Sequence, residues 1–63
     1  MEGRVKWFNY DKGYGFILGD DGNDYFVHHS RTNEELRDND RVSFEVVKTD
    51  RGLQAQDVYL INK

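Results

Sequence analysis

The sequence predicts a small all-β protein whose five short strands form a barrel or a sandwich. Apolar and polar residues alternate with a period of two over most of the 63-residue chain, which is the pattern of half-buried strands. Clusters of turn-forming residues separate these segments at short intervals, as they do in antiparallel hairpins. The expected strands cover residues 3–9, 13–18, 24–29, 41–48 and 54–61. A chain of this length is expected to form one domain, residues 1–63.

The alternation assigns each side chain to the inner or the outer face of the predicted sheet. Small β-branched residues are expected to fill the interior: Val5, Ile17, Val27, Val42, Val46 and Val58. Rings from two neighbouring strands are expected to point outward: Tyr14, Phe16, Phe26 and His28. Gly13 and Gly15 fall on the inner face, where they allow close packing of the backbone. Because Trp7 and Phe8 are adjacent and a regular strand turns neighbours to opposite faces, we expect a bulge or bend near Asn9.

Residues 32–37 are the one segment with helical character. Thr32 can cap a helix and Glu35 can close a capping box, but the segment contains one apolar residue and runs into the turn-forming Asp38. We therefore expect no more than a single helical turn there, of the α or the 3₁₀ type.

The composition excludes several classes of function. The chain has no Cys, which excludes disulfide bridges, Cys-ligated zinc and thiol catalysis. No apolar run approaches the ~20 residues of a membrane-spanning helix, and no apolar segment follows residues 1–4 as it would in a signal peptide. We therefore expect a cytoplasmic protein. Aromatic residues make up 14% of a chain that is poor in Leu and Ile, so the rings are expected to do more than fill a core.

The charge is mildly acidic but unevenly distributed. Nine Lys and Arg against twelve Asp and Glu give a net charge of −3, whereas proteins that bind nucleic acid are usually basic. The acidic residues fall mainly in the turns at residues 20–24 and 34–40. Lys6, Lys12 and Arg51 instead stand beside aromatic or Gly-rich positions. The arrangement of these three cations therefore decides whether a basic surface exists.

The patterns that could indicate catalysis or a bound metal are weak. Strand alternation sends His28 and His29 to opposite faces, so only one of them could join Asp24, and a catalytic zinc site needs three protein ligands. Ser30 beside His29 lacks the oriented third member of a catalytic triad. Gly13-x-Gly15 lacks the third glycine and the following helix of a dinucleotide-binding loop. We expect a protein that is not an enzyme and that has no metal, cofactor or small-molecule substrate.

The outward rings alternate with cations and amides, and two interpretations of this mixture stay open. Platforms for unpaired bases combine rings for the base faces with cations for the phosphates. This combination occurs in Lys6-Trp7-Phe8-Asn9, Lys12-Gly13-Tyr14-Gly15-Phe16 and Phe26-Val27-His28-His29. The alternative is an aromatic face that pairs with another protein chain, including a domain-swapped copy of this one.

These segments resemble the bacterial cold-shock proteins, small members of the cold-shock-domain family. The resemblance extends over essentially the whole chain, from Gly3-Arg4-Val5-Lys6-Trp7-Phe8-Asn9 to Arg51-Gly52-Leu53-Gln54-Ala55. Lys12-Gly13-Tyr14-Gly15-Phe16-Ile17 and Asp24-Tyr25-Phe26-Val27-His28 are similar to the two ribonucleoprotein motifs of the family. The resemblance implies a five-stranded antiparallel β-barrel of the OB type that binds single-stranded RNA and DNA. It also implies a role as an RNA chaperone or transcription antiterminator in a cold-shock or stress response, with a monomer expected.

The resemblance also implies a set of nucleic-acid-binding residues. Positions that contact the ligand in the family correspond here to Lys6, Trp7, Lys12, Tyr14, Phe16, Phe26 and His28, and polar positions to Asn9, Asp24, Arg51 and Gln54. His29 joins this set, at a position where the family commonly has Phe or Trp.

The chain departs from the family pattern at three further places. Residues 30–40 contain neither Gly nor an aromatic ring, which predicts a shorter contact surface than in the family. Leu53 replaces a common Pro. Tyr25 occupies an inward position that is usually aliphatic, so its hydroxyl is expected to reach the rim of the barrel and find a partner there.

Overall fold

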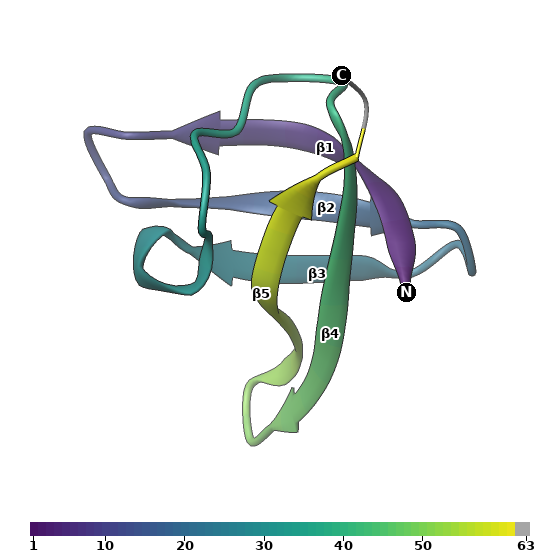
Figure 1. The fold of residues 1–63 in the computed structure, drawn as a ribbon. Coiled ribbons are helices and arrows are strands. Elements are labelled where there is room, and N and C mark those ends of the chain that lie inside the picture. Colours follow the sequence, from purple (N-terminus) through teal and green to yellow (C-terminus); the bar gives the residue numbers. More distant parts are fainter. Residues whose placement is uncertain (62–63) are drawn as a thin grey trace.

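In the computed structural model, which describes residues 1–61, five strands close into a barrel (Figure 1). The strands are β1 (Glu2–Asn9), β2 (Tyr14–Gly19), β3 (Asp24–His28), β4 (Arg41–Thr49) and β5 (Gly52–Leu60). Their order around the barrel is β1-β2-β3-β5-β4. Every neighbouring pair is antiparallel except β3 and β5, which meet in parallel where Phe26 faces Gln54. The predicted all-β barrel of the OB type is confirmed, and the strand boundaries lie close to the predicted ones.

The barrel consists of two layers that cross each other. β1, β2 and β3 form a meander, and the β4–β5 hairpin lies across it (Figure 1). β1 pairs with β4 only through residues 2–4 of β1 and 41–43 of β4. Beyond that point β4 pairs with β5 alone, so the hairpin extends past the barrel, as the lower part of Figure 1 shows.

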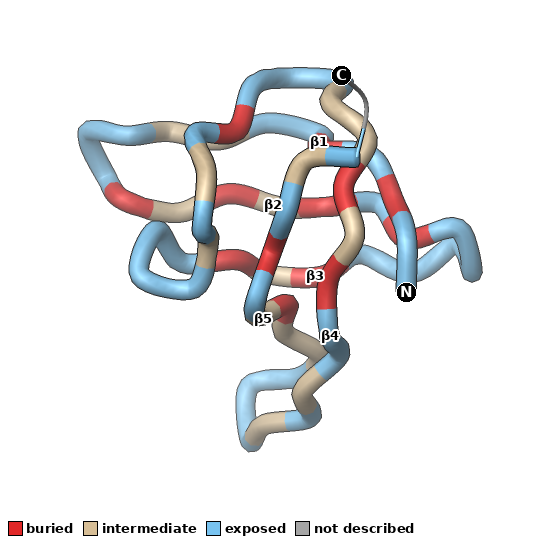
Figure 2. Tube along the Cα trace, in the orientation of Figure 1, coloured by how far each residue is buried: buried red, intermediate tan, exposed pale blue. Residues whose placement is uncertain are grey.

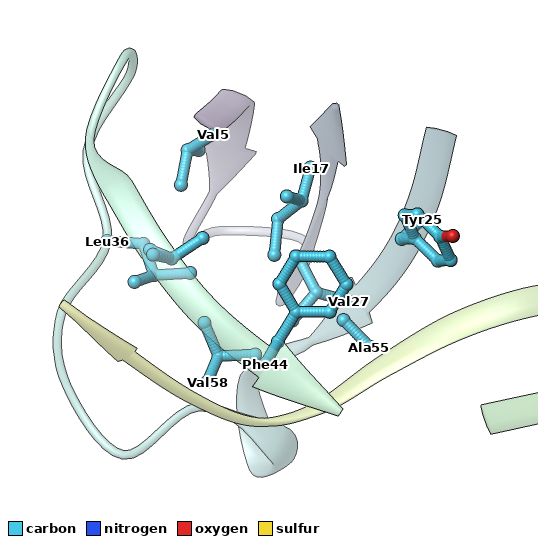
Figure 3. Packing of buried hydrophobic residues seen from close by; sticks show 9 residues of the cluster. Val5, Ile17, Tyr25, Val27, Leu36, Phe44, Ala55 and Val58 are labelled. Atoms are coloured by element: carbon cyan, nitrogen blue, oxygen red, sulfur yellow. The ribbon is translucent and has the colours of Figure 1, made fainter. Parts of the chain in front are cut away.

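Nine apolar side chains form the core between the two layers. They are Val5, Ile17, Tyr25, Val27, Leu36, Val42, Phe44, Ala55 and Val58. Buried and more exposed positions alternate along the strands (Figure 2), and the side chains converge from all five strands (Figure 3). Burying each of the larger ones contributes roughly 1.5–3 kcal/mol, so this cluster is the main source of stability for so short a chain.

The predicted interior is confirmed at Val5, Ile17, Val27, Val42 and Val58, all fully buried. The prediction is wrong for Val46, whose side chain is 42% exposed. Val46 belongs to the part of β4 that has no strand other than β5 beside it. The apolar–polar alternation along β4 continues to this position, but the barrel interior ends before it.

A bulge in β1 turns Trp7 outward, and regular alternation after it sends Phe8 inward. The register with β2 shifts between Val5 and Trp7, two residues or more before the expected position near Asn9. Lys6 and Trp7 are consequently both exposed, while Phe8 is half-buried and packs against the core. Gly15 makes this packing possible, because a Cβ atom there would lie 2.3 Å from the carbonyl oxygen of Trp7.

The connection between β3 and β4 closes one end of the barrel. Residues 32–37 form no helical turn, which agrees with the expectation of at most a single turn there; η1 (His29–Arg31), just before this segment, is the sole helix among the described residues. Its three residues are far too few to cross a membrane. Leu36 is instead drawn into the core. The hydroxyl of Tyr10 donates to the carbonyl of Leu36 at 3.2 Å and accepts from its backbone N–H. These tertiary contacts outweigh the local capping signal at Thr32.

Tyr25 points inward, as expected, and its ring packs against Phe44 at a centroid distance of 5.1 Å. Its hydroxyl reaches the rim, where it donates to Oδ2 of Asp21 in the turn between β2 and β3. This hydrogen bond holds the pKa of Asp21 below its usual value and raises that of the Tyr25 hydroxyl. The polar end of a buried ring is thus satisfied, which is the expectation stated from the sequence.

Candidate nucleic-acid interface

Four aromatic rings from three strands lie side by side on the outer face of the meander. Trp7, Tyr14, Phe16 and Phe26 form this group, here called the ring strip. Phe16 stands directly opposite Trp7 on one side and Phe26 on the other, and cross-strand neighbours of this kind touch. The centroid distances are 5.5 Å from Trp7 to Phe16, 5.7 Å from Trp7 to Tyr14, 5.6 Å from Tyr14 to Phe26 and 5.8 Å from Phe16 to Phe26. The rings therefore form one continuous surface.

The ring strip stays accessible even though its members touch. Trp7 is 39% exposed, and the other three rings are half-buried. All four pack against each other in tilted or edge-to-face arrangements, which are favourable for aromatic pairs. This mutual packing holds the rings in place while part of each ring faces solvent. A contiguous apolar surface of this type marks an interaction site.

The two histidines lie together at one end of the ring strip. His28 stands opposite Tyr14, and its ring centroid lies 4.4 Å from that of His29. The expectation that strand alternation sends them to opposite faces is wrong, because β3 ends at His28 and η1 begins at His29. His28 caps η1, with Nδ1 accepting the backbone N–H of Ser30 at 3.3 Å. The neutral ring then carries its proton on Nε2, which is left as a donor.

The cations around the ring strip differ in how they are paired. Nζ of Lys6 lies 3.3 Å from each carboxylate oxygen of Asp24. Both side chains are about half exposed, so this ion pair is worth at most about 1 kcal/mol and can exchange for a phosphate. In the part of the chain that the structure describes, Lys12 and Arg51 form no ion pair. These charges are available to a ligand.

A cleft joins the ring strip to the hairpin layer. Its volume is about 270 Å³, and it is lined by Phe16, Asp24, Phe26, Arg51, Leu53 and Gln54. The parallel contact of Phe26 with Gln54 closes the barrel at this point. The cleft thus brings Arg51 and Gln54, distant in sequence, beside the rings of β2 and β3. Leu53 was not among the predicted binding residues. Its place two residues before Ala55 puts its side chain on the core-facing side of β5, where it packs against the core and lines the cleft.

The remaining predicted residues lie at the end of the meander near the β1–β2 turn. Asn9 shapes this turn: its Oδ1 accepts the backbone N–H of Lys12 at 3.1 Å, and its carbonyl accepts that of Gly13 at 2.8 Å. The His29 ring lies against Gly13, where a Cβ atom would approach its Cδ2 atom to 2.8 Å. The structure therefore places Asn9 in a supporting position and leaves the Lys12 side chain exposed.

A second hollow opens beyond this turn, but its charge does not suit a phosphate. It has a volume of about 600 Å³ and lies between the β1–β2 turn and residues 32–35. Lys12 and His29 line it on the side of the ring strip, but the carboxylates of Asp11, Glu34 and Glu35 outnumber its single lysine. Phosphates are repelled by such a rim, so this hollow limits the basic surface on that side.

Other carboxylates are held away from the ring strip. Arg41 donates to Asp20 at 2.9 and 3.1 Å and to Glu2 at 3.2 Å. The Arg41 hydrogen bond lowers the pKa of Asp20, and Asp20 in turn raises that of Arg41. Glu2 precedes Trp7 by five residues in β1, a separation of about 16 Å along a strand. The net charge of −3 thus does not describe the local field at the rings.

Comparison with known proteins agrees with this arrangement. Residues 1–61 match the family model of the 'Cold-shock' DNA-binding domain. The chain is 52% identical over 60 residues to cold shock protein 1 of Lactiplantibacillus plantarum, covering 89% of this chain and 91% of that protein. It is 51% identical over 61 residues to cold shock protein CspA of Staphylococcus saprophyticus, covering 90% and 92%. It is 47% identical over 62 residues to cold shock-like protein CspC of Bacillus cereus, covering 92% and 95%. This chain therefore belongs to the cold-shock domain family.

Proposed function

We propose that this protein binds single-stranded RNA and DNA by stacking unpaired bases on the ring strip. The observation that carries the proposal is the continuity of four partly exposed rings across β1, β2 and β3. Lys6, Lys12 and Arg51 supply cations at its borders, and His28 supplies an N–H donor. Base–aromatic stacking is worth about 1–3 kcal/mol per base and tolerates any base, because every base has a π-face.

The same geometry supports a preference for unpaired strands. In a duplex the base faces are covered by neighbouring bases, so a ring on a rigid sheet cannot reach them. A protein that binds only the unpaired form shifts the equilibrium toward it by mass action. We propose that the protein uses this effect as an RNA chaperone or transcription antiterminator in a cold-shock or stress response. It then acts as a binding module and not as an enzyme, and a cytoplasmic monomer remains our prediction.

A fluorescence titration tests the proposal. Trp7 is the one Trp of the chain and part of the ring strip, so a stacked oligothymidine is expected to quench its emission. The logarithm of the binding constant should fall with the logarithm of salt concentration, with a slope of about −0.7 for each phosphate contact. A blunt duplex of equal length should compete poorly.

The outcome separates the two interpretations of the rings. An aromatic face that binds a protein partner predicts binding that holds or strengthens as salt rises, and self-association that depends on concentration. If the duplex competes as well as the single strand, or if the oligothymidine leaves the emission unchanged, the stacking proposal is wrong.

A further inference from the structure

We propose that the nucleic-acid interface continues from the ring strip onto the β4–β5 hairpin, where Lys48 contacts the phosphate backbone. This inference rests on the proposed function and adds a contact that the resemblance to the family does not include. It starts from the cleft beside Phe26, whose far wall is formed by Leu53 and Gln54 of β5.

The register of the hairpin places Lys48 on the same face as the wall of the cleft. Lys48 stands directly opposite Leu53, and Val46 directly opposite Ala55. Opposed residues in an antiparallel pair project from the same face, with Cβ atoms about 4.5–5.5 Å apart. Leu53 packs against the core and lines the cleft. Lys48 is therefore the next side chain that a strand leaving the cleft across β5 would meet.

This face of the hairpin is open to a ligand. β4 has β1 beside it only at residues 41–43, and the hairpin protrudes beyond the barrel (Figure 1). Lys48 is exposed, and Val46 is 42% exposed beside it. An exposed apolar side chain next to a cation repeats the combination of apolar groups and bordering cations found at the ring strip. Val46 lies outside the barrel interior, and in this proposal its exposed side chain is part of the surface that contacts the nucleic acid.

The charges of the hairpin favour a phosphate on this side. Within residues 1–61, Lys48 and Arg51 form no ion pair. Glu45 stands opposite Gln56 and accepts a hydrogen bond from it at 3.4 Å. Its position three residues before Lys48 puts its side chain on the other face. Asp50, in the exposed turn, is the remaining carboxylate close in sequence.

Hydrogen bonds order the backbone of the turn between the two cations. Oγ1 of Thr49 donates to the carbonyl of Gly52 at 3.0 Å and accepts the backbone N–H of Arg51 at 3.2 Å. Gly52 has a φ of 115°, a conformation that disfavours other residues. Because the turn is ordered in this way, a phosphate chain that meets Arg51 at the cleft lies close to Lys48 without rearrangement of the hairpin.

The test compares Lys48→Gln with Arg37→Gln as a matched control. Arg37 is also exposed, but it lies in a hollow beside Leu60, roughly 20 Å along β5 from Leu53. Both variants remove one positive charge. The probes are oligothymidines of about four and about eight nucleotides, in the lower part of the range that OB folds cover, and the readout is the fluorescence of Trp7.

We expect Lys48→Gln to bind the longer strand roughly five-fold more weakly at about 0.1 M salt, with a salt slope shallower by about 0.7. Lys48→Arg should restore both values, and Arg37→Gln should leave both near those of the unaltered protein. If Lys48→Gln and Arg37→Gln give the same affinity and slope, the inference is wrong while the proposed function stands. If the unaltered protein does not bind either strand, the proposed function fails first and the inference with it.

Discussion

Phe26 and Val27 are neighbours in β3 whose side chains lie on opposite faces of the barrel wall, and replacing each by Ala tests the whole assignment of faces. Phe26 belongs to the ring strip and touches Tyr14 and Phe16. Val27 is fully buried in the core. The two substitutions are one residue apart, so they share the same strand, register and neighbouring turns. Their effects should nevertheless fall on different properties.

The magnitudes follow from what each side chain contacts. Phe26→Ala removes one stacking platform and should cost about 1–3 kcal/mol in binding, which is roughly a five- to 150-fold loss of affinity. It also removes two partly exposed ring contacts, so a smaller loss of stability accompanies it. Val27→Ala deletes two buried carbon atoms and leaves a cavity, which should cost about 1.5–3 kcal/mol in the free energy of unfolding. That is a large fraction of the roughly 3–9 kcal/mol expected for a 63-residue chain.

Urea unfolding and oligothymidine titration, both followed by Trp7, measure the two quantities. The Trp7 ring contacts Tyr14 and Phe16 but is not paired with Phe26, so the reporter keeps its own neighbours in both variants. Affinity is evaluated for the fraction that remains folded. If Phe26→Ala unfolds the domain while Val27→Ala abolishes binding by folded protein, the faces are assigned backwards and the set of binding residues falls with them.

Two further substitutions test the core and its rim. Leu36→Ala should lower the free energy of unfolding by about 2–5 kcal/mol, because Leu36 is buried in the core. The control Leu18→Ala, at a 43% exposed position, should change it by less than about 0.5 kcal/mol. Equal effects of the two substitutions in urea unfolding would contradict the packing of Leu36. Tyr25→Phe should destabilise the protein above about pH 4 but progressively less below it. The Tyr25 hydroxyl lowers the pKa of Asp21, so the stability that it confers is present above the usual pKa of Asp and lost as the pH falls through the lowered value. Unfolding curves across the acid range check this, and a difference that does not vary with pH would contradict it.

The strands could be predicted from the sequence because their signal is local. Both the alternation of apolar and polar residues with a period of two and the clusters of turn-forming residues depend only on neighbours in the chain. The predictions for Val46 and the two histidines failed because each depends on which segments meet, and the burial of Leu36 was not predicted for the same reason. Alternation alone does not show that β1 leaves β4 after residue 43, or that a distant hydroxyl draws Leu36 into the barrel.

In the candidate site, too, some positions follow from local sequence pattern and others depend on which segments meet. The outward direction of Tyr14, Phe16 and Phe26 follows from alternation, and their adjacency follows from the short hairpin between β2 and β3. Trp7 joins them only because a bulge rotates it outward, and the position of that bulge was not predicted correctly. The family resemblance supplied Arg51 and Gln54, whose place beside the rings could not be derived from local pattern.

The cleft depends on the closure of the barrel, and this links binding to folding. Its walls come from β2 and β3 on one side and from Arg51 and the start of β5 on the other, and β3 and β5 meet in the ladder through a single residue pair. That junction has fewer backbone hydrogen bonds than the antiparallel pairs, so it is the place where the barrel is expected to open most easily. A strand of nucleic acid that contacts both Phe26 and Arg51 would bridge the junction and favour the closed form. At a ligand concentration of about 100 times Kd, such linkage adds about 2.7 kcal/mol, which is comparable to the loss that a single core substitution causes. Thermal unfolding of the Val27→Ala variant should therefore be shifted back toward that of the unaltered protein by an oligothymidine long enough to span the cleft.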